Sequence, residues 1–365
     1  MNVQELVRQA LHGEIATTAP PPGEWQGVLT RGIEIRRRRR RARSVLGSLV
    51  VVALTMGTLA AVGTFTGRPS IVATPAAPSA LPARVVALTS DDRTLVELDP
   101  VTGALRRTIA SLPHDVLRVE LTPDGSAAWL WEQPDGLPCS AQLNPGAIAR
   151  VDLATGTVGA SIRGASPALS SDGRRLAYVD VPCDAGQTAS SVVVRDLVAG
   201  TDHRLSLQSP PSAAPYVVEG PLTWPGDSRH LVVGVTGYSK TTGAKSYESW
   251  YVDAAASTIE NPQTIPISYA GPLDLAALGA TAQFAAVVPG TTRVVELAVP
   301  EGTVRRTLID FPDARFVSIA GIDQSGRHLL LLVADRADGS VALYRWSQGD
   351  AQPTRLAPGI FAADW

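Results

Sequence analysis

The chain has few of the residues that most enzymes use for catalysis or metal binding. Its 365 residues include two cysteines, five histidines and two methionines. No Gly-x-Ser-x-Gly elbow, His-Glu-x-x-His pair or phosphate-binding loop is present. His230 and His328 stand at the same place in two similar segments, which favours a structural role for both. The sequence therefore predicts no catalytic residue, no metal site and no cofactor, and we expect a protein that is not an enzyme.

Charge is also sparse and unevenly distributed. Charged residues make up 18% of the chain, whereas glycine occurs 32 times and proline 28 times, which suits many short strands joined by tight turns. Residues 1–44 hold nine arginines against four glutamates, and residues 84–365 hold 22 lysines and arginines against 30 aspartates and glutamates. The acidic balance of the second part argues against nucleic-acid binding.

One pattern occurs four times between residues 120 and 333: an apolar strand, a polar turn and a second apolar strand. The copies lie at 121–131, 169–179, 223–233 and 322–332. The turns contain Asp124, Asp172, Asp227 and Asp323. Carboxylates in such turns accept hydrogen bonds from nearby backbone N–H groups, so we assign these four to the fold.

A second repeated hairpin follows the first in each unit. Its copies lie at 95–109, 148–158, 192–201 and 294–308, and each has glycine in its turn. Each unit thus has four strands, A to D. A period of roughly 40 to 50 residues with four strands per unit is typical of an all-β fold, the β-propeller.

The complete units fall at 116–162, 166–207, 218–265, 273–309 and 317–356. Two fragments remain: the segment from Arg84 to Ile109 lacks a strand A, and the segment from Gly359 to Trp365 resembles a strand A alone. If the second fragment completes the first, the ring closes at six blades and leaves no open sheet edge. A seven-bladed ring with two degenerate blades merged is the alternative.

The turns resemble those of the TolB-like and WD40-like β-propeller family, whose A–B turn commonly reads Ser-Pro-Asp-Gly. The nearest copies are Thr-Pro-Asp-Gly at 122–125 and Ser-Ser-Asp-Gly at 170–173. The resemblance implies a six-bladed propeller over residues 84–365. It implies little about function, because propellers serve as binding modules, sensors and enzymes alike.

An uncharged run at 45–66 predicts a transmembrane helix. As a helix, its 22 residues are about 33 Å long and match the hydrocarbon core of a bilayer. Arginines at 36–41 and 43 precede it, so the positive-inside rule predicts a cytoplasmic arm at 1–44 and an extracytoplasmic propeller. A cleaved signal peptide is the alternative for the apolar run, and a nucleic-acid patch is the alternative for the arginines.

The proline- and alanine-rich residues 67–83 are expected to form an extended linker. The chain then enters the ring on the side of the A–B turns, so that face should lie nearer the membrane. The longest insertions follow strand B of three successive blades on the opposite face, at 132–147, 180–191 and 236–249. This face is the expected surface for a protein partner, with random loop variation as the alternative.

These insertions contain the candidate site residues of the propeller. The candidate partner-binding residues are Tyr238, Lys240, Lys245 and Tyr247. Cys139 and Cys183 lie in the first two insertions, and their even number outside the cytoplasm favours a disulfide over two free thiols or a metal site.

The predicted cytoplasmic arm has a short amphipathic helix with Leu6, Val7 and Leu11 on its apolar face. Such a face lies on the membrane or docks on a partner, so these three are candidate cytoplasmic partner-binding residues. The layout of arm, anchor and outer domain resembles actinobacterial membrane regulators, including anti-sigma factors, and this resemblance implies a cytosolic partner such as a sigma factor. The His-x-x-x-Cys-x-x-Cys motif of zinc-type anti-sigma factors is missing, because no cysteine precedes Cys139.

Together these features predict a single-pass protein of the cell membrane, with its propeller outside the cytoplasm. We expect a binding or envelope-scaffold module without catalysis. A signalling regulator with the propeller as sensor is one alternative, and a propeller hydrolase or cyclotransferase is another.

Overall fold

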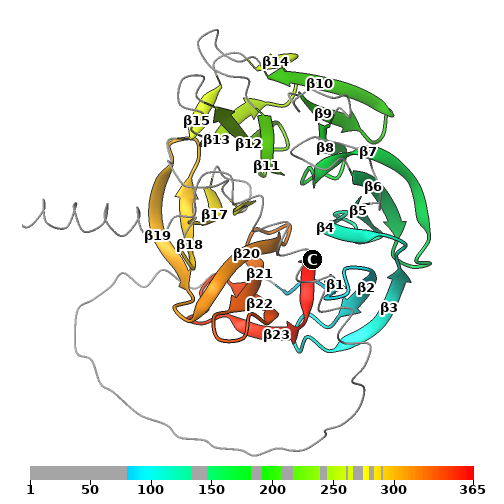
Figure 1. Ribbon diagram of the computed structural model, residues 1–365, viewed down its shortest axis with the longest axis vertical. Helices are drawn as coiled ribbons and strands as arrows, with labels where there is room; N and C mark the ends of the chain where they lie inside the picture. Colours follow the sequence, from blue (N-terminus) through cyan, green and yellow to red (C-terminus); the bar gives the residue numbers. More distant parts are fainter. Residues whose placement is uncertain are drawn as a thin grey trace, which may run out of the picture. The chain divides into compact units, whose positions relative to one another are not determined.

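Antiparallel sheets stand around a common centre in the described part of the chain, which is the arrangement of a β-propeller (Figure 1). The computed structural model describes residues 80–133, 146–181, 191–207, 217–238, 245–259, 262–265, 274–278, 283–288 and 291–365. Within these residues the regular structure is entirely β, in agreement with the all-β class predicted from the repeats.

Four sheets have four strands each. In the order of hydrogen bonding they are β24 (Ile360–Asp364), β1 (Val85–Thr89), β2 (Thr94–Leu98) and β3 (Leu105–Ser111); β11 (Val217–Thr223), β12 (His230–Tyr238), β13 (Lys245–Asp253) and β15 (Gln263–Ile265); β16 (Asp274–Ala277), β17 (Gln283–Val287), β18 (Arg293–Ala298) and β19 (Thr303–Asp310); and β20 (Ala314–Ile322), β21 (His328–Asp335), β22 (Val341–Ser347) and β23 (Thr354–Pro358). The predicted units at 218–265, 273–309 and 317–356 coincide closely with the last three of these sheets.

The remaining sheet has eight strands. They are β4 (Asp115–Leu121), β5 (Ala127–Gln133), β6 (Gly146–Asp152), β7 (Val158–Leu169), β8 (Arg175–Asp180), β9 (Ser191–Asp196), β10 (Thr201–Leu207) and β14 (Thr258–Ile259). The sheet is continuous because β7 pairs with β6 through its first half and with β8 through its second half. The short β14 pairs in parallel with the end of β10, an addition that the repeats did not predict.

The prediction that the C-terminal segment completes the first sheet is confirmed. β24 pairs with β1 in antiparallel register, with Val86 opposite Asp364 and Leu88 opposite Ala362. Strands from opposite ends of the described region thus share one sheet, and β1 has neighbours on both sides. This pairing leaves β1 without an open edge.

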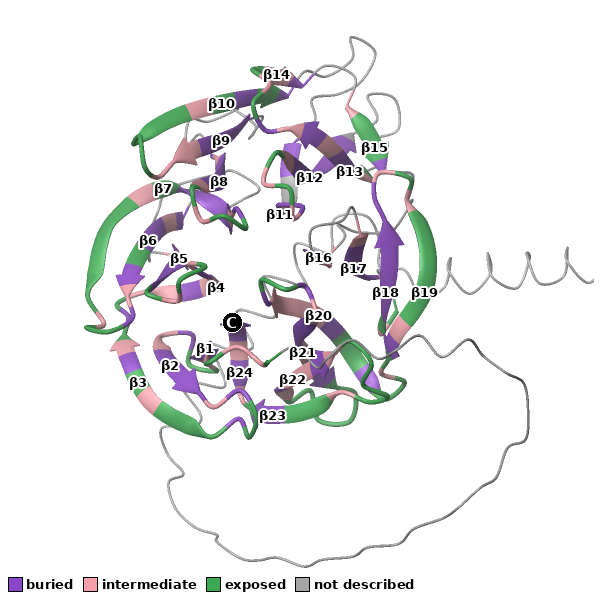
Figure 2. Ribbon diagram, turned by 180° about the vertical axis from the view of Figure 1, so that it is seen from behind, coloured by how far each residue is buried: buried purple, intermediate pink, exposed green. Residues whose placement is uncertain are grey.

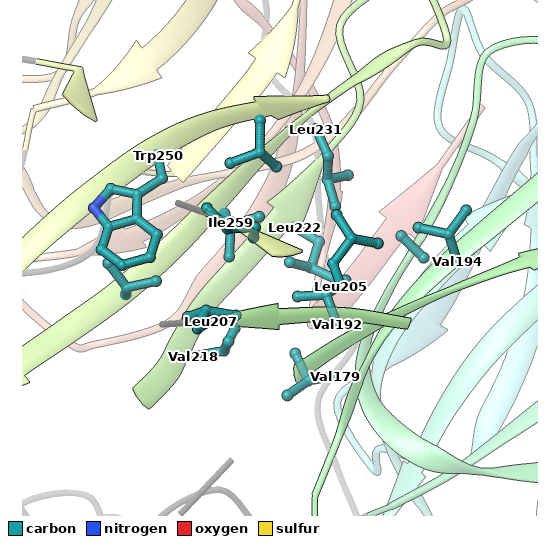
Figure 3. Close-up of a cluster of buried hydrophobic side chains, with 14 of the residues drawn as sticks. Val179, Val192, Val194, Leu205, Leu207, Val218, Leu222, Leu231, Trp250 and Ile259 are labelled. Atoms are coloured by element: carbon teal, nitrogen blue, oxygen red, sulfur yellow. The ribbon is translucent and has the colours of Figure 1, made fainter. Parts of the chain in front are cut away.

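Apolar side chains fill the spaces between neighbouring sheets. One such cluster packs β8, β9 and β10 against β11, β12 and β13, with Leu205, Leu222 and Leu231 fully buried and Trp250 2% exposed (Figure 3). Replacing one of these leucines with alanine is expected to destabilise the fold by about 2 to 5 kcal/mol. Middle strands of the sheets, such as β1 and β17, are therefore buried on both faces, whereas outer strands such as β19 are mostly exposed (Figure 2).

Two features predicted from the sequence lie outside the described residues. These are the cytoplasmic arm with Leu6, Val7 and Leu11, and the proposed disulfide between Cys139 and Cys183. The apolar run at 45–66 also lies outside them. Among the residues that the structure describes, no helix has the length and hydropathy to cross a bilayer.

Candidate functional site in the central cavity

A cavity of about 660 Å³ lies within the ring of sheets. Its wall takes residues from β4, β7, β11, β16, β20 and β24, and of these β4, β11, β16, β20 and β24 stand around the centre in Figure 2. At one end it is bordered by A–B turns, which include residues 122–125 and 323–325. A cavity of this volume accommodates a small molecule.

Arg118 and Glu120 reach the cavity from β4. Side chains two residues apart lie on the same face of a strand, so the two can meet. A bulge between Val116 and Arg118 shifts the alternation of β4, so that Val116 and Val119 both enter the core while Arg118 and Glu120 face the cavity. The guanidinium Nε of Arg118 donates to Oε1 of Glu120 over 2.5 Å, and the two side chains keep 31% and 18% of their surface exposed.

Asp274 stands at the start of β16. Its Oδ2 accepts hydrogen bonds from the Ser318 hydroxyl at 2.6 Å and from the Ile319 backbone N–H at 2.8 Å, both on β20. Desolvation inside the ring raises the pKa of Asp274, although these hydrogen bonds and the charge of Arg118 oppose the shift. Asp274 thus joins two sheets while its carboxylate remains costly to ionise.

Asp364 lies at the end of β24. Its Oδ2 accepts a hydrogen bond from the Leu121 backbone N–H of β4 at 2.7 Å. Desolvation and then the negative charge of Glu120 raise the pKa of Asp364 well above its ordinary value. The carboxylate fits beside β20 because residue 321 is glycine: a Cβ at Gly321 would lie 2.3 Å from Oδ1 of Asp364.

Carboxylates outnumber arginines in the cavity wall. Five acids, Asp124, Glu120, Asp274, Asp323 and Asp364, face two arginines, Arg84 and Arg118. The charge of Arg118 is stabilised by Glu120, Asp274 and Asp364, which outweigh the desolvation of the guanidinium and raise its pKa. The cavity therefore has a negative balance whenever its carboxylates are ionised.

The two rim aspartates belong to the turns that hold them. Asp124 accepts from the Ser126 backbone N–H at 3.0 Å, and Asp323 accepts from the Arg327 and His328 backbone N–H groups at 2.8 and 2.7 Å. Asp172 and Asp227 bond their own turns in the same way. The prediction that the four turn aspartates serve the fold is confirmed.

Two indole rings in the wall are fixed by hydrogen bonds. Nε1 of Trp224 donates to the Ala168 carbonyl at 3.0 Å, and Nε1 of Trp365 donates to the His328 carbonyl at 3.1 Å. His328 is buried and packs edge-on against Trp365, which agrees with the structural role predicted for it. The polar edge of each indole is satisfied by the protein, so the rings offer the cavity mainly apolar surface.

The segment that leads into the ring also borders the cavity. Ala80, Pro82, Ala83 and Arg84 line it just before β1 begins. The Ala83 carbonyl accepts a hydrogen bond from Arg106 Nη1 at 2.7 Å, and Arg84 lies 4.0 Å from Glu97. The end of the predicted linker is therefore held against the first sheet at the rim of the cavity.

Three candidate residues of the outer face lie on two paired strands: Tyr238 on β12, and Lys245 and Tyr247 on β13. In the backbone pairing Tyr238 is opposite Lys245, and Thr236 is opposite Tyr247, which is half-buried. Lys240 lies outside the described residues. A partner site on these strands stays a prediction.

Sequence reasoning missed four of the charged residues in the cavity wall, namely Arg118, Glu120, Asp274 and Asp364. One signal was present: Arg118 and Glu120 interrupt a segment that reads as strand A of a propeller blade, the strand expected to line the centre. Asp274 and Asp364 stand at strand ends, where carboxylates are common, and gave no comparable signal. Their convergence depends on the ring, which a linear pattern does not reveal.

Comparison with known proteins yields resemblance in fold only. No protein-family model and no curated protein sequence matches the chain. Solved structures that resemble it include a TolB of Agrobacterium tumefaciens (12% identity, TM-score 0.49, 76% of this chain and 90% of that chain), the Cps50 β-propeller domain of Myceliophteria thermophila (13%, 0.44, 74% and 84%) and an oligogalacturonate lyase of Vibrio parahaemolyticus (12%, 0.41, 75% and 71%). These similarities agree with the propeller fold seen in the sheets themselves.

The prediction that the chain is not an enzyme requires correction. Structures that resemble it include the oligogalacturonate lyase, a hydrazine synthase of Kuenenia stuttgartiensis and a dihydro-heme d1 dehydrogenase. Missing sequence motifs do not exclude catalysis, because catalytic groups on a propeller come from separate blades and need no local motif. At 12 to 15% identity the same structures assign no activity to this chain.

Proposed function

We propose that this chain is a ligand-binding β-propeller whose binding site is the central cavity. The observation that carries the proposal is the set of Arg118, Glu120, Asp274 and Asp364, which three strands bring to one cavity wall. Charged groups inside a ring of sheets cost stability, and raised carboxylate pKa values such as those of Asp274 and Asp364 are typical of functional sites. A purely structural centre would be expected to use apolar side chains there, as β20 does with Ile319 and Ile322.

The test is a thermal-shift screen of small molecules against the full-length chain and a cavity-filling variant. Thr223 lines the cavity from β11, and Thr223→Trp would occupy part of its volume. Compounds that bind the cavity should raise the melting temperature of the native chain and lose that effect in Thr223→Trp. Tyr247→Ala, on β13, is the matched control and should leave the effect unchanged.

Compounds that stabilise the native chain and Thr223→Trp equally, but not Tyr247→Ala, would contradict the cavity site. They would instead support the outer face as the binding surface. Unfolding curves of both variants in buffer verify that each variant folds before ligands are compared.

The proposal includes six blades and a membrane anchor. The blade count is supported by treating the eight-stranded sheet as two blades joined through β7, since a cluster of buried side chains, with Trp129 and Tyr178, packs its two halves together. The anchor is supported by the apolar run at 45–66 and the arginines before it. The module then works outside the cytoplasm, tethered by residues 67–83.

A second candidate function is signalling across the membrane. It is favoured by the contact of Ala80, Pro82 and Arg84 with the cavity, because a ligand there would touch the segment that leads toward the predicted anchor. In that case residues 1–35 should retain a cytosolic protein such as a sigma factor in a pull-down. Leu6→Asp should abolish retention, because an unpaired charge is costly to bury at an interface; retention of nothing by the native arm would exclude this function for it.

A further inference from the structure

Asp274 and Asp364 lie deep in the ring without a cationic partner. Among the described residues, neither carboxylate takes part in an ion pair, and each accepts hydrogen bonds from neutral groups, namely Ser318 and Ile319 for Asp274 and Leu121 for Asp364. Arg118 acts on both through its charge, but its Nε is bonded to Glu120. Both arginines of the cavity wall already have a carboxylate partner, since Arg118 is bonded to Glu120 and Arg84 lies 4.0 Å from Glu97.

Carboxylates so placed need a compensating charge. Proteins supply it with arginine or lysine, with a bound cation, or by protonating the acid. Desolvation raises the pKa of both aspartates here, which means that the surrounding protein groups do not fully stabilise the ionised forms. A cation bound in the cavity would supply the compensating charge for the two carboxylates.

The rest of the wall limits what kind of cation fits. Leu169, Ile319, Ala320 and Ile322 contribute apolar surface, together with the fixed ring of Trp224. The volume of about 660 Å³ is far larger than a metal ion requires and suits a molecule with a hydrocarbon body. An ammonium group has three N–H donors and no acceptor, so it can bond two carboxylates at once.

We propose that the cavity binds a small organic amine in its cationic form, with Asp274 and Asp364 as the counter-ions of the ammonium group. The inference rests on the proposed function, since it names the class of ligand for the same cavity. Glu120 remains the partner of Arg118, and its role is to keep the guanidinium away from the ammonium position.

The experiment is calorimetric titration of the full-length chain, purified in detergent, with three four-carbon probes. Putrescine carries two ammonium groups, butanediol is neutral and succinate is anionic. Putrescine should bind and the other two should not. Asp364→Asn and, independently, Asp274→Asn should weaken putrescine binding at least about tenfold, as expected when one charged hydrogen-bond acceptor is lost.

Asp202→Asn is the matched control, because this substitution also removes one negative charge but does so outside the cavity wall. Asp202 stands on the outer strand β10, and 48% of its side chain is exposed. It should leave putrescine affinity unchanged. Asparagine keeps an acceptor for the Leu121 N–H, so Asp364→Asn should still fold, and an unfolding curve verifies this for each variant.

Three binding results would overturn the inference, as would the absence of putrescine binding. They are binding of butanediol or succinate instead of putrescine, equal loss in Asp202→Asn and Asp364→Asn, and displacement of putrescine by calcium or magnesium at lower concentration. Absence of putrescine binding also overturns it, while compounds sensitive to Thr223→Trp would still uphold the cavity as a binding site. The two proposals therefore fail separately.

Discussion

Asp124 and Asp364 are carboxylates that the molecule uses in opposite ways. Hydrogen bonds from the Thr122 hydroxyl and the Ser126 backbone lower the pKa of Asp124 to about 2, so its charge favours the folded state. Burial and the charge of Glu120 raise the pKa of Asp364, so its charge disfavours the folded state. A site that binds a cation would be expected to contain carboxylates like Asp364, whose charge the protein alone does not stabilise.

Asp364→Asn should therefore stabilise the chain at neutral pH when no ligand is present. The substitution removes a desolvated charge beside Glu120 and keeps an oxygen to accept the Leu121 N–H. The gain is expected to be on the order of 1 kcal/mol in the free energy of unfolding, measured by denaturant titration. A loss of stability at pH 7 would show that the ionised Asp364 is compensated by the protein itself.

The same variant should reveal a pH dependence. A folded-state pKa raised above the ordinary value of 3.8 means that Asp364 costs nothing below pH 3.8 and costs progressively more as pH rises through the folded-state pKa. The stability difference between Asp364→Asn and the native chain should thus be small near pH 4 and grow toward pH 7. Arg118, Glu120 and Asp274 face the same cavity and are present in both proteins, so the difference reports the removal of the Asp364 carboxylate from among these neighbours.

Gly321→Ala should destabilise the fold through Asp364. The new Cβ would lie 2.3 Å from Oδ1 and 3.1 Å from Cα of Asp364, so either β20 or β24 must shift. The expected cost is about 1 to 3 kcal/mol by chemical unfolding. Gly159→Ala on β7 is the control, because its Cβ would meet nothing closer than 3.4 Å; an equal effect of the two would contradict the clash.

Among single residues, those that stabilise turns could be predicted from the sequence better than those that line the cavity. Asp124 and Asp323 were identifiable because a carboxylate and its partners lie within a few residues in one turn. Asp364 bonds Leu121, which is far away in the chain, and its fit depends on Gly321 of a third strand. No local pattern contains that information.

Among the elements, β24 has the largest consequence for the ring. It contributes buried Ile360, Ala362 and Ala363 and covers one edge of β1. Deleting residues 360–365 should expose that edge and remove much of a typical net stability of about 5 to 15 kcal/mol. Calorimetry should show a large fall in melting temperature with reduced solubility, and deletion of Trp365 alone should have a smaller effect; an unchanged melting curve would mean that the ring closes without β24.

Most strands could be predicted because apolar alternation and turn glycines are local. The exceptions were β7 and β14. β7 continues through Gly164, where a Cβ would lie 2.6 Å from the Tyr178 ring, so its course is set by a neighbour and not by a turn. β14 pairs in parallel with β10 at Ser206 and Leu207, although it lies in the sequence between β13 and β15 of another sheet, and such a contact has no signature in either segment.

For the whole molecule, the predicted orientation follows from where the chain enters the ring. Ala80 to Arg84 and the end of β24 both border the cavity, on the side of the turns at 122–125 and 323–325. If residues 45–66 span the membrane, protease added to intact cells should digest the propeller and spare residues 1–44, because the arginines hold the arm inside. Digestion of the arm, or a full-length chain recovered without membranes, would contradict this topology.

The pairing of β24 with β1 also sets the order in which the molecule can be completed. β1 is synthesised long before β24. The first sheet is therefore complete only after synthesis reaches Asp364, which pairs with Val86. During synthesis the first sheet has a free edge, and closing so long a loop is slow relative to forming local hairpins. Because Asp364 arrives on that closing strand, the ring and the charged cavity mature in a single late event, and an incomplete chain lacks both.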